Sequence, residues 1–296
     1  MPIEKLAPEL DRIVSTSQDI EELGSGYGGD AGPAEGPLWW HEDNQLIFSD
    51  IGNNRRMKWK DAEGVTLVQQ PTDYANGLTR DRQGRLVACE HGTRRVTRQD
   101  PDGSLTVVAN RYHGRRLNRP NDVVVKSDGS IYFTDPGMER VESELDFAGV
   151  YRVSSDLGTI NCLVRDFIVP NGLAFSADES ILYINDSRRM HIRAFNVAPN
   201  GILSLHTDRI FSEQSGTLPG LPDGMKVDIE DNVYCTGPGG IWITDKNGNH
   251  LGIVLTGAQT TNLAWGGPDW TTLYYTNYHS LGRIQMKIPG IPVPAQ

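Results

Sequence analysis

The chain has 296 residues, of which 38% are hydrophobic, and 28 lysines and arginines stand against 38 aspartates and glutamates, for a net charge of −10. The negative charge argues against a nucleic-acid partner, because binding to phosphates requires a basic surface. No apolar run approaches the length of a membrane span, so we expect no membrane association.

The N-terminal residues, MPIEKLAPELDRIV, lack the apolar stretch of a signal peptide. They predict a cytoplasmic protein, or a periplasmic one if a leader has been removed. A helical period is visible only near residues 8–14, where a short helix is expected.

One short phrase recurs six times after this segment. Each copy has a polar first residue, a small or acidic second residue, an apolar pair, a charged turn and an apolar strand. The copies begin at six residues, which we call the openers: Glu35, Asn76, Asn121, Asn171, Asp223 and Thr261. Successive openers lie 38 to 52 residues apart. A turn-rich repeat of about 40 to 50 residues is typical of β-propellers.

Each repeat predicts four strands joined by polar turns. In the first repeat the later strands are QLIFSDI, RRMKWK and VTLVQQ, which alternate or are rich in β-branched and aromatic residues. The sequence therefore predicts an all-β fold, a six-bladed β-propeller with four-stranded antiparallel blades around a central channel. Because there is no linker or shift in composition, we expect one domain, 1–296, in which residues 1–30 close or cover the ring.

Equivalent positions of a propeller surround its channel, so the openers are expected to face a common axis. Two carboxylates and two amides among them, completed by water, suit Ca²⁺ or Mg²⁺. We expect one divalent cation, Ca²⁺ first, with Mg²⁺, Mn²⁺ and Zn²⁺ as alternatives, although Zn²⁺ prefers histidine or cysteine. Asn-Gly and Asp-Gly are also common turn formers, so a single opener can be only a turn residue.

Four segments together resemble a known family: AEGPLW, RPNDVVVKSDGSIYFTDP, NGLAFSADESILYINDS and LPDGMKVDIEDNVY. They are similar to the SMP-30/gluconolactonase/luciferin-regenerating enzyme-like family over roughly residues 30–285. The resemblance implies a six-bladed propeller with a divalent metal, often calcium, in its channel. It also implies hydrolysis of sugar lactones, other lactones or, in some relatives, organophosphates.

The resemblance also implies roles for particular residues. Metal ligands are implied at four openers: Glu35, Asn121, Asn171 and Asp223. Asp223 is in addition the implied general base. The R-x-N-D motif implies substrate contacts at three positions: Arg119, Asn121 and Asp122.

Two further residues are candidates for substrate binding because of their place in the second repeat. Asn76 is its opener, and a turn role is the equal alternative. His91 follows an inner strand, from which it could reach the channel mouth, and the alternative is a surface turn. His279 has a similar position in the last repeat, with a weaker case.

The predicted function is metal-dependent hydrolysis of a lactone, first of all a sugar lactone such as gluconolactone. The metal would polarise the lactone carbonyl, and Asp223 would take a proton from the attacking water. Activation of the water by the metal itself is the alternative. Two other functions stay open: a phosphotriesterase-like hydrolase in the same channel, and a non-catalytic calcium-binding regulatory propeller. The expected partner is a small-molecule lactone, and the expected assembly is a monomer or homodimer.

Overall fold

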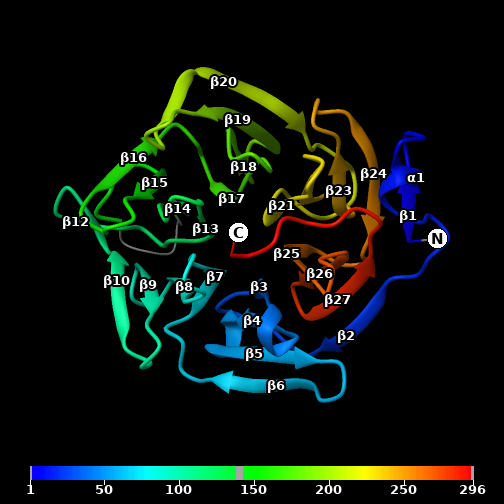
Figure 1. Cartoon of the computed structure of the whole chain (residues 1–296), viewed down its shortest axis with the longest axis horizontal. Coiled ribbons are helices and arrows are strands. Elements are labelled where there is room, and N and C mark those ends of the chain that lie inside the picture. The colour runs from blue at the N-terminus through cyan, green and yellow to red at the C-terminus, as the bar shows by residue number, and fades with distance from the viewer. Residues whose placement is uncertain (1, 138–142, 295–296) are drawn as a thin grey trace.

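The computed structural model describes residues 2–137 and 143–294. Residues 1, 138–142 and 295–296, which belong to the predicted range 1–296, lie outside these limits. Six antiparallel β-sheets are arranged in a ring around one axis (Figure 1). The predicted six-bladed β-propeller is thereby confirmed. Across the described ranges, no helix combines the length and apolar character that a bilayer span requires.

The first three blades each contain four strands, ordered from the axis to the rim. Blade 1 contains β3 (Ala34–Trp40), β4 (Gln45–Asp50), β5 (Arg55–Lys60) and β6 (Gly64–Gln69). Blade 2 contains β7 (Ala75–Arg80), β8 (Leu86–Glu90), β9 (Arg95–Gln99) and β10 (Leu105–Ala109). Blade 3 contains β13 (Val123–Val125), β14 (Ile131–Asp135), β15 (Gly149–Val153) and β16 (Ile160–Val164). A small hairpin, β11 (Arg111–Tyr112) and β12 (Arg115–Arg116), precedes blade 3.

The last three blades continue the ring, and two of them take a strand from the N-terminal segment. Blade 4 contains β17 (Pro170–Phe175), β18 (Ile181–Asp186), β19 (His191–Val197) and β20 (Leu203–Glu213). Blade 5 contains β21 (Met225–Val227), β22 (Val233–Gly237), β23 (Gly240–Thr244) and β24 (His250–Leu255), with β1 (Ile3–Lys5) added at its rim. Blade 6 contains β25 (Thr260–Gly266), β26 (Thr272–Asn277), β27 (Ser280–Gln285) and β2 (Glu21–Ser25).

The N-terminal segment therefore supplies two rim strands. β2 pairs with β27, so the outermost strand of blade 6 comes from the opposite end of the chain. β1 pairs with β24 and makes blade 5 five-stranded, one strand more than the expected four. An added strand satisfies the backbone groups of a sheet edge that would otherwise stay unpaired. The helix α1 (Leu10–Ile13) lies between them, within the stretch where a short helix was expected, and short 3₁₀ turns follow at His41–Asp43 and Ile51–Asn53.

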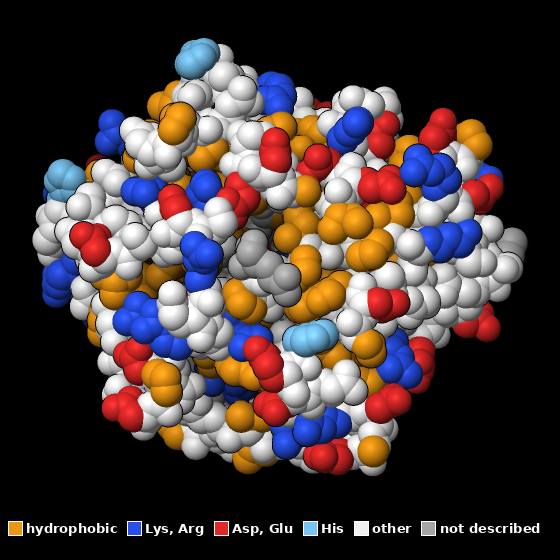
Figure 2. All heavy atoms as spheres, in the orientation of Figure 1, with side chains coloured by type: hydrophobic (Ala, Val, Ile, Leu, Met, Phe, Trp, Pro, Cys, Tyr) orange, Lys and Arg blue, Asp and Glu red, His pale blue; other side chains and the backbone are white. Residues whose placement is uncertain are grey.

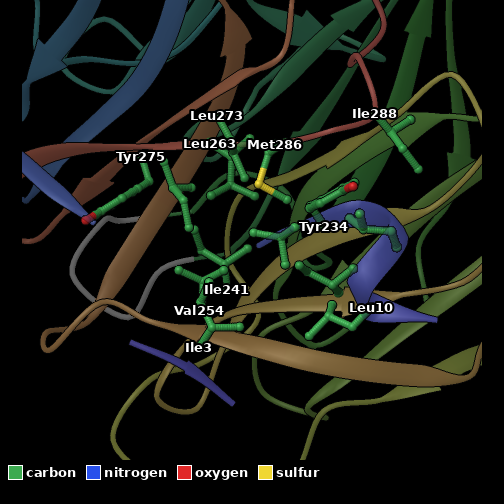
Figure 3. Close-up of a cluster of buried hydrophobic side chains, with 14 of the residues drawn as sticks. Ile3, Leu10, Tyr234, Ile241, Val254, Leu263, Leu273, Tyr275, Met286 and Ile288 are labelled. Carbon is green, nitrogen blue, oxygen red and sulfur yellow. The ribbon is translucent and has the colours of Figure 1, made fainter. Parts of the chain in front are cut away.

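Buried apolar clusters hold neighbouring blades together. Between blades 5 and 6, one cluster joins Tyr234 and Ile241 to Leu263 and Tyr275 (Figure 3). Leu10 from α1 is fully buried in the same cluster. Successive side chains of a strand point to opposite faces of its sheet, so each blade has apolar side chains on the faces that pack against its neighbours. Stacked repeats require such packing.

Candidate active site

A cavity of about 880 Å³, here called the site cavity, opens at one end of the channel. It is bordered by residues at the start of the inner strands. A second cavity of about 340 Å³ is bordered by later residues of the same strands, so the two lie at opposite ends of the channel. Seven of the eight predicted site residues line the site cavity: Glu35, Asn76, His91, Arg119, Asn121, Asn171 and Asp223.

The openers reach the axis because the blades approach each other closely there. Gly77 N donates to Asn121 O at 2.9 Å and Gly172 N donates to Asp223 O at 3.0 Å, so main chains of neighbouring blades are joined at the openers. A Cβ added at Gly172 would lie 2.1 Å from Asp223 O. The glycine that follows four of the openers is therefore required by packing, because only glycine leaves space for the next blade.

Three asparagine side chains form a chain of hydrogen bonds along the cavity wall. Asn76 Nδ2 donates to Asn121 Oδ1, and Asn121 Nδ2 donates to Asn171 Oδ1. Asn171 Nδ2 donates onward to Ser187 Oγ at 3.0 Å. Because each amide nitrogen serves as a donor, the chain determines where each amide oxygen lies. Asn76 Oδ1 is buried without a hydrogen-bond partner among the described residues, and this leaves an oxygen available to a ligand.

Two of the openers that border the same cavity carry carboxylates. Glu35 is buried, and Asp223 is partly exposed to the cavity. Burial, followed by the negative charge of Asp122, raises the pKa of Glu35. Burial, followed by the charge of Glu35, raises the pKa of Asp223 well above its ordinary value. The protein alone thus disfavours two ionised carboxylates here, and a nearby cation would favour them.

The donor set fits a hard divalent cation. The carboxylates of Glu35 and Asp223 and the amide oxygens of Asn121 and Asn171 are the oxygen ligands that Ca²⁺ and Mg²⁺ prefer. In residues 2–137 and 143–294, no group of three or more His, Cys, Asp or Glu is arranged to hold a metal. A cation in this cavity would therefore depend on the asparagine oxygens as well as on the two acids.

Asp122 is the predicted site residue that does not line the cavity. It is 4% exposed, its Oδ1 accepts a hydrogen bond from Val123 N at 2.9 Å, and its Oδ2 lies 3.5 Å from Asn262 Nδ2. Asp122 is buried against these two groups and is not among the residues that line the site cavity, so its predicted substrate contact stays a prediction. The R-x-N-D motif alone does not show which of its residues border the cavity.

His91 lies in the cavity wall as a neutral imidazole. Burial, followed by the positive charge of Arg119, lowers the pKa of His91 to about 3. Its Nε2 lies 3.1 Å from Asn76 Nδ2, which is a donor, so Nε2 accepts and the proton is on Nδ1. His279 instead places Nδ1 2.8 Å from Tyr27 O, and its neighbour Tyr278 lines the cavity.

Several lining residues were missed by the sequence reasoning, and four of them share with the predicted His91 one place in the repeat. The residue directly after the second strand of a blade borders the cavity in five blades: Ile51, His91, Pro136, Ser187 and Tyr278. Alignment of the phrases FSD-I, ACE-H, FTD-P, IND-S and YTN-Y would have found this position. Arg188 and Asp30, which also line the cavity, lie in loops that the repeat does not define.

Comparison with known proteins finds a matching family model and similar lactonases. The family model described as SMP-30/Gluconolactonase/LRE-like region matches residues 33–279. The chain is similar to a gluconolactonase of Zymomonas mobilis, with 32% identity over 97% of this chain and 87% of that protein. It is also similar to the pentonolactonase XacC of Haloferax volcanii, with 27% identity over 82% of this chain and 80% of that protein.

Solved structures show the same similarity in three dimensions. A Xanthomonas campestris protein described as a gluconolactonase superposes with a TM-score of 0.86 at 32% identity, over 98% of this chain and 95% of that one. A calcium-binding protein of Agrobacterium tumefaciens, regucalcin, superposes with a TM-score of 0.76 at 20% identity, over 94% of this chain and 97% of that one. The second similarity concerns the fold alone.

Proposed function

Since the chain belongs to the SMP-30/gluconolactonase/LRE-like family, we propose that it is a metal-dependent lactonase that opens a sugar lactone to the hydroxy acid. The observation that carries this proposal is the convergence of Glu35, Asn121, Asn171 and Asp223 from four blades on one cavity. The similarity to a gluconolactonase over 97% of the chain supports the lactone as substrate class.

The four converging residues would hold the cation. A bound divalent cation supplies Lewis acidity to the lactone carbonyl and stabilises the oxyanion that develops there. The amide chain from Asn76 to Ser187 keeps the asparagine oxygens in place before a ligand arrives. A site fixed in advance loses less free energy to ordering when the substrate binds.

Hydrolysis adds water across the ring ester. The water oxygen bonds to the carbonyl carbon and gives up a proton, the ring C–O bond breaks, and the ring oxygen takes up that proton and leaves as a hydroxyl group. Asp223 is the carboxylate that borders the cavity with partial exposure, so we assign it the proton of the attacking water. Arg119, Asn76 and His91 line the remaining wall, and their donors and acceptors suit the hydroxyl groups of a sugar.

The test is a proton-release assay with a panel of lactones and one phosphotriester. We expect hydrolysis of aldonolactones such as gluconolactone, loss of activity in EDTA, and recovery with Ca²⁺, Mg²⁺ or Mn²⁺. Hydrolysis of the phosphotriester in preference to every lactone would overturn the substrate class. Absence of any turnover by a protein that binds Ca²⁺ would instead support a non-catalytic calcium-binding propeller.

A further inference from the structure

The residue that directly follows an opener is glycine in four blades and a larger polar residue in the other two. A Cβ on Gly36 or Gly77 would lie 2.2 or 2.5 Å from main-chain oxygens of the next blade. The other two are Asp122 in blade 3 and Asn262 in blade 6, which stand on opposite sides of a six-bladed ring. Their side chains therefore enter the channel directly behind the openers.

Asn262 is connected to one of the proposed metal ligands. It is 3% exposed, and its Nδ2 donates to Glu35 Oε2 at 2.9 Å. Its Oδ1 accepts from Leu263 N at 2.8 Å and lies 3.4 Å from Lys226 Nζ. The main-chain hydrogen bond fixes the amide, so that Nδ2 must face Glu35.

The same carboxylate oxygen has a second donor. Gly36 N donates to Glu35 Oε2 at 2.5 Å. Oε2 is thus held by two N–H groups, and the described residues provide no hydrogen bond to Oε1. A carboxylate held in this way presents one oxygen in a fixed direction, whereas a carboxylate without these donors can rotate and offer both.

We propose that Asn262 is a positioning residue that holds Glu35 Oε2 and thereby directs Oε1 alone to the cation. This inference rests on the proposed metal site and adds a residue to it that neither the repeat nor the family resemblance identified. The side chain fills the channel tightly, since a Cβ on Gly224 would lie 2.0 Å from Asn262 Oδ1. Outer groups that orient metal ligands typically change metal affinity by about 10- to 100-fold when they are removed.

The structure also explains why an amide suits this position. Asn262 Nδ2 lies between two carboxylates, 2.9 Å from Glu35 Oε2 and 3.5 Å from Asp122 Oδ2. An aspartate of the same shape would place a third negative charge beside them without a donor. A glycine, as in four of the other blades, would leave Glu35 Oε2 with the Gly36 N–H alone.

The test is a double-mutant cycle for calcium affinity, measured by calorimetry on the full-length, metal-free protein. The four proteins are wild type, Asn262→Ala, Glu35→Gln and the double variant. We expect Asn262→Ala to weaken Ca²⁺ binding about 10- to 100-fold in the wild-type background. In the Glu35→Gln background the same change should weaken binding less than about threefold, because an effect that acts through Glu35 disappears with its carboxylate.

The matched control is Asn232→Ala. Asn232 is also buried, and its Nδ2 donates to the carboxylate of Asp228 at 2.8 Å. Asp228 directly follows Val227, which lines the second cavity and not the site cavity. This variant should lose thermal stability and keep its calcium affinity. If Asn262→Ala fails to fold, Asn262→Ser replaces it in the cycle, since the serine hydroxyl is too short to reach Glu35.

The outcomes separate the inference from the proposed function. Equal fold-changes for Asn262→Ala with and without the Glu35 carboxylate, or an unchanged affinity, would overturn the positioning role and leave the metal site standing. Failure of the wild-type protein to bind any divalent cation would overturn the metal site and this inference together.

Discussion

Asp223 combines two proposed roles in one side chain, because it borders the cavity with partial exposure and lies beside Glu35. Asp223→Asn keeps an oxygen ligand and nearly the same volume, but it removes the charge and the basicity. We expect weaker metal binding and, at saturating Ca²⁺, a kcat reduced by about 100-fold or more, the size of effect expected for loss of a general base. Recovery of kcat to the wild-type level at saturating Ca²⁺ would show that Asp223 is only a ligand.

Arg119 lies in the cavity wall beside the asparagine chain, where its guanidinium can contact substrate oxygens. A hydrogen bond to a charged group contributes about 1.5–3 kcal/mol. Arg119→Ala should therefore raise KM roughly 10- to 100-fold while changing calcium affinity little. Arg82→Ala, at an exposed position in a turn, serves as the control with unchanged KM. A variant that loses calcium affinity but keeps its KM would contradict the assignment.

Asp135 gives a pH dependence whose sign can be worked out. Its carboxylate accepts hydrogen bonds from Asn118 N at 2.7 Å and Arg119 N at 2.5 Å, and burial raises its pKa to about 7. Between about pH 4, near the pKa of an unfolded aspartate, and pH 7, the folded state keeps a proton that the unfolded state has lost. The contribution of Asp135 to stability is therefore complete below about pH 4 and declines as the pH rises through 7.

Denaturant unfolding at several pH values from 4.5 to 7.5 checks this dependence. The decline in unfolding free energy with rising pH should be shallower in Asp135→Asn than in wild type. An identical slope in the two proteins would show that Asp135 titrates normally in the folded state.

At the scale of elements, the ends of the second strands organise the cavity. Asp50, Asp135 and Asp186 end β4, β14 and β18, and each accepts a hydrogen bond from a main-chain N–H of a loop near the cavity: Gly28 N, Asn118 N and Ile168 N. An acid at this place lets a blade hold the loop that lines the site. The residue that follows the acid then faces the cavity.

The N-terminal elements stabilise the ring through one buried side chain in particular. Leu10 in α1 is fully buried among residues of blades 5 and 6 (Figure 3). Leu10→Ala should lower the free energy of unfolding by about 2–5 kcal/mol, the cost of a buried cavity. Leu6→Ala, at a side chain that is 51% exposed, should change it by less than about 0.5 kcal/mol. Equal losses in the two variants by denaturant unfolding would show that α1 is not docked as described.

The strands inside the repeats could be predicted from sequence, and the N-terminal strands could not. Phrases such as SIYFTD alternate and lie at fixed distances from an opener, so β14 was predicted together with its neighbours. EELGS, which forms β2, has no alternation of its own. Its strand conformation depends on pairing with β27, a partner more than 250 residues away, and such tertiary pairing leaves no local pattern.

The same distinction applies to the site. Openers such as Glu35 and Asn171 could be predicted to meet, because equivalent positions of a repeat surround one axis. Arg188 and Asp30 could not, since they lie in loops whose path depends on contacts between blades. Asn262 was also missed, because its role depends on the direction of one amide toward Glu35.

At the scale of the whole molecule, the channel has two different ends. The C-terminal segment up to residue 294 crosses one end of the channel toward the axis (Figure 1), and Gly290 N donates a hydrogen bond to Trp270 O at 2.9 Å. Hydrophobic side chains gather on this face beside the segment (Figure 2), and Ile291, Pro292 and Val293 line the second cavity. The site cavity lies at the other end, so we propose that substrate enters there and that the chain acts as one domain.

The central claim is that lactone hydrolysis depends on one cation bound in the site cavity. The most direct measurement titrates Ca²⁺ into metal-free protein and follows bound calcium and gluconolactone hydrolysis in the same samples. We predict that activity rises in proportion to bound calcium and saturates at one ion per chain, and that Glu35→Gln shifts both curves together to higher calcium. Full hydrolysis by protein that contains no metal, or calcium binding without any change in activity, would contradict the account.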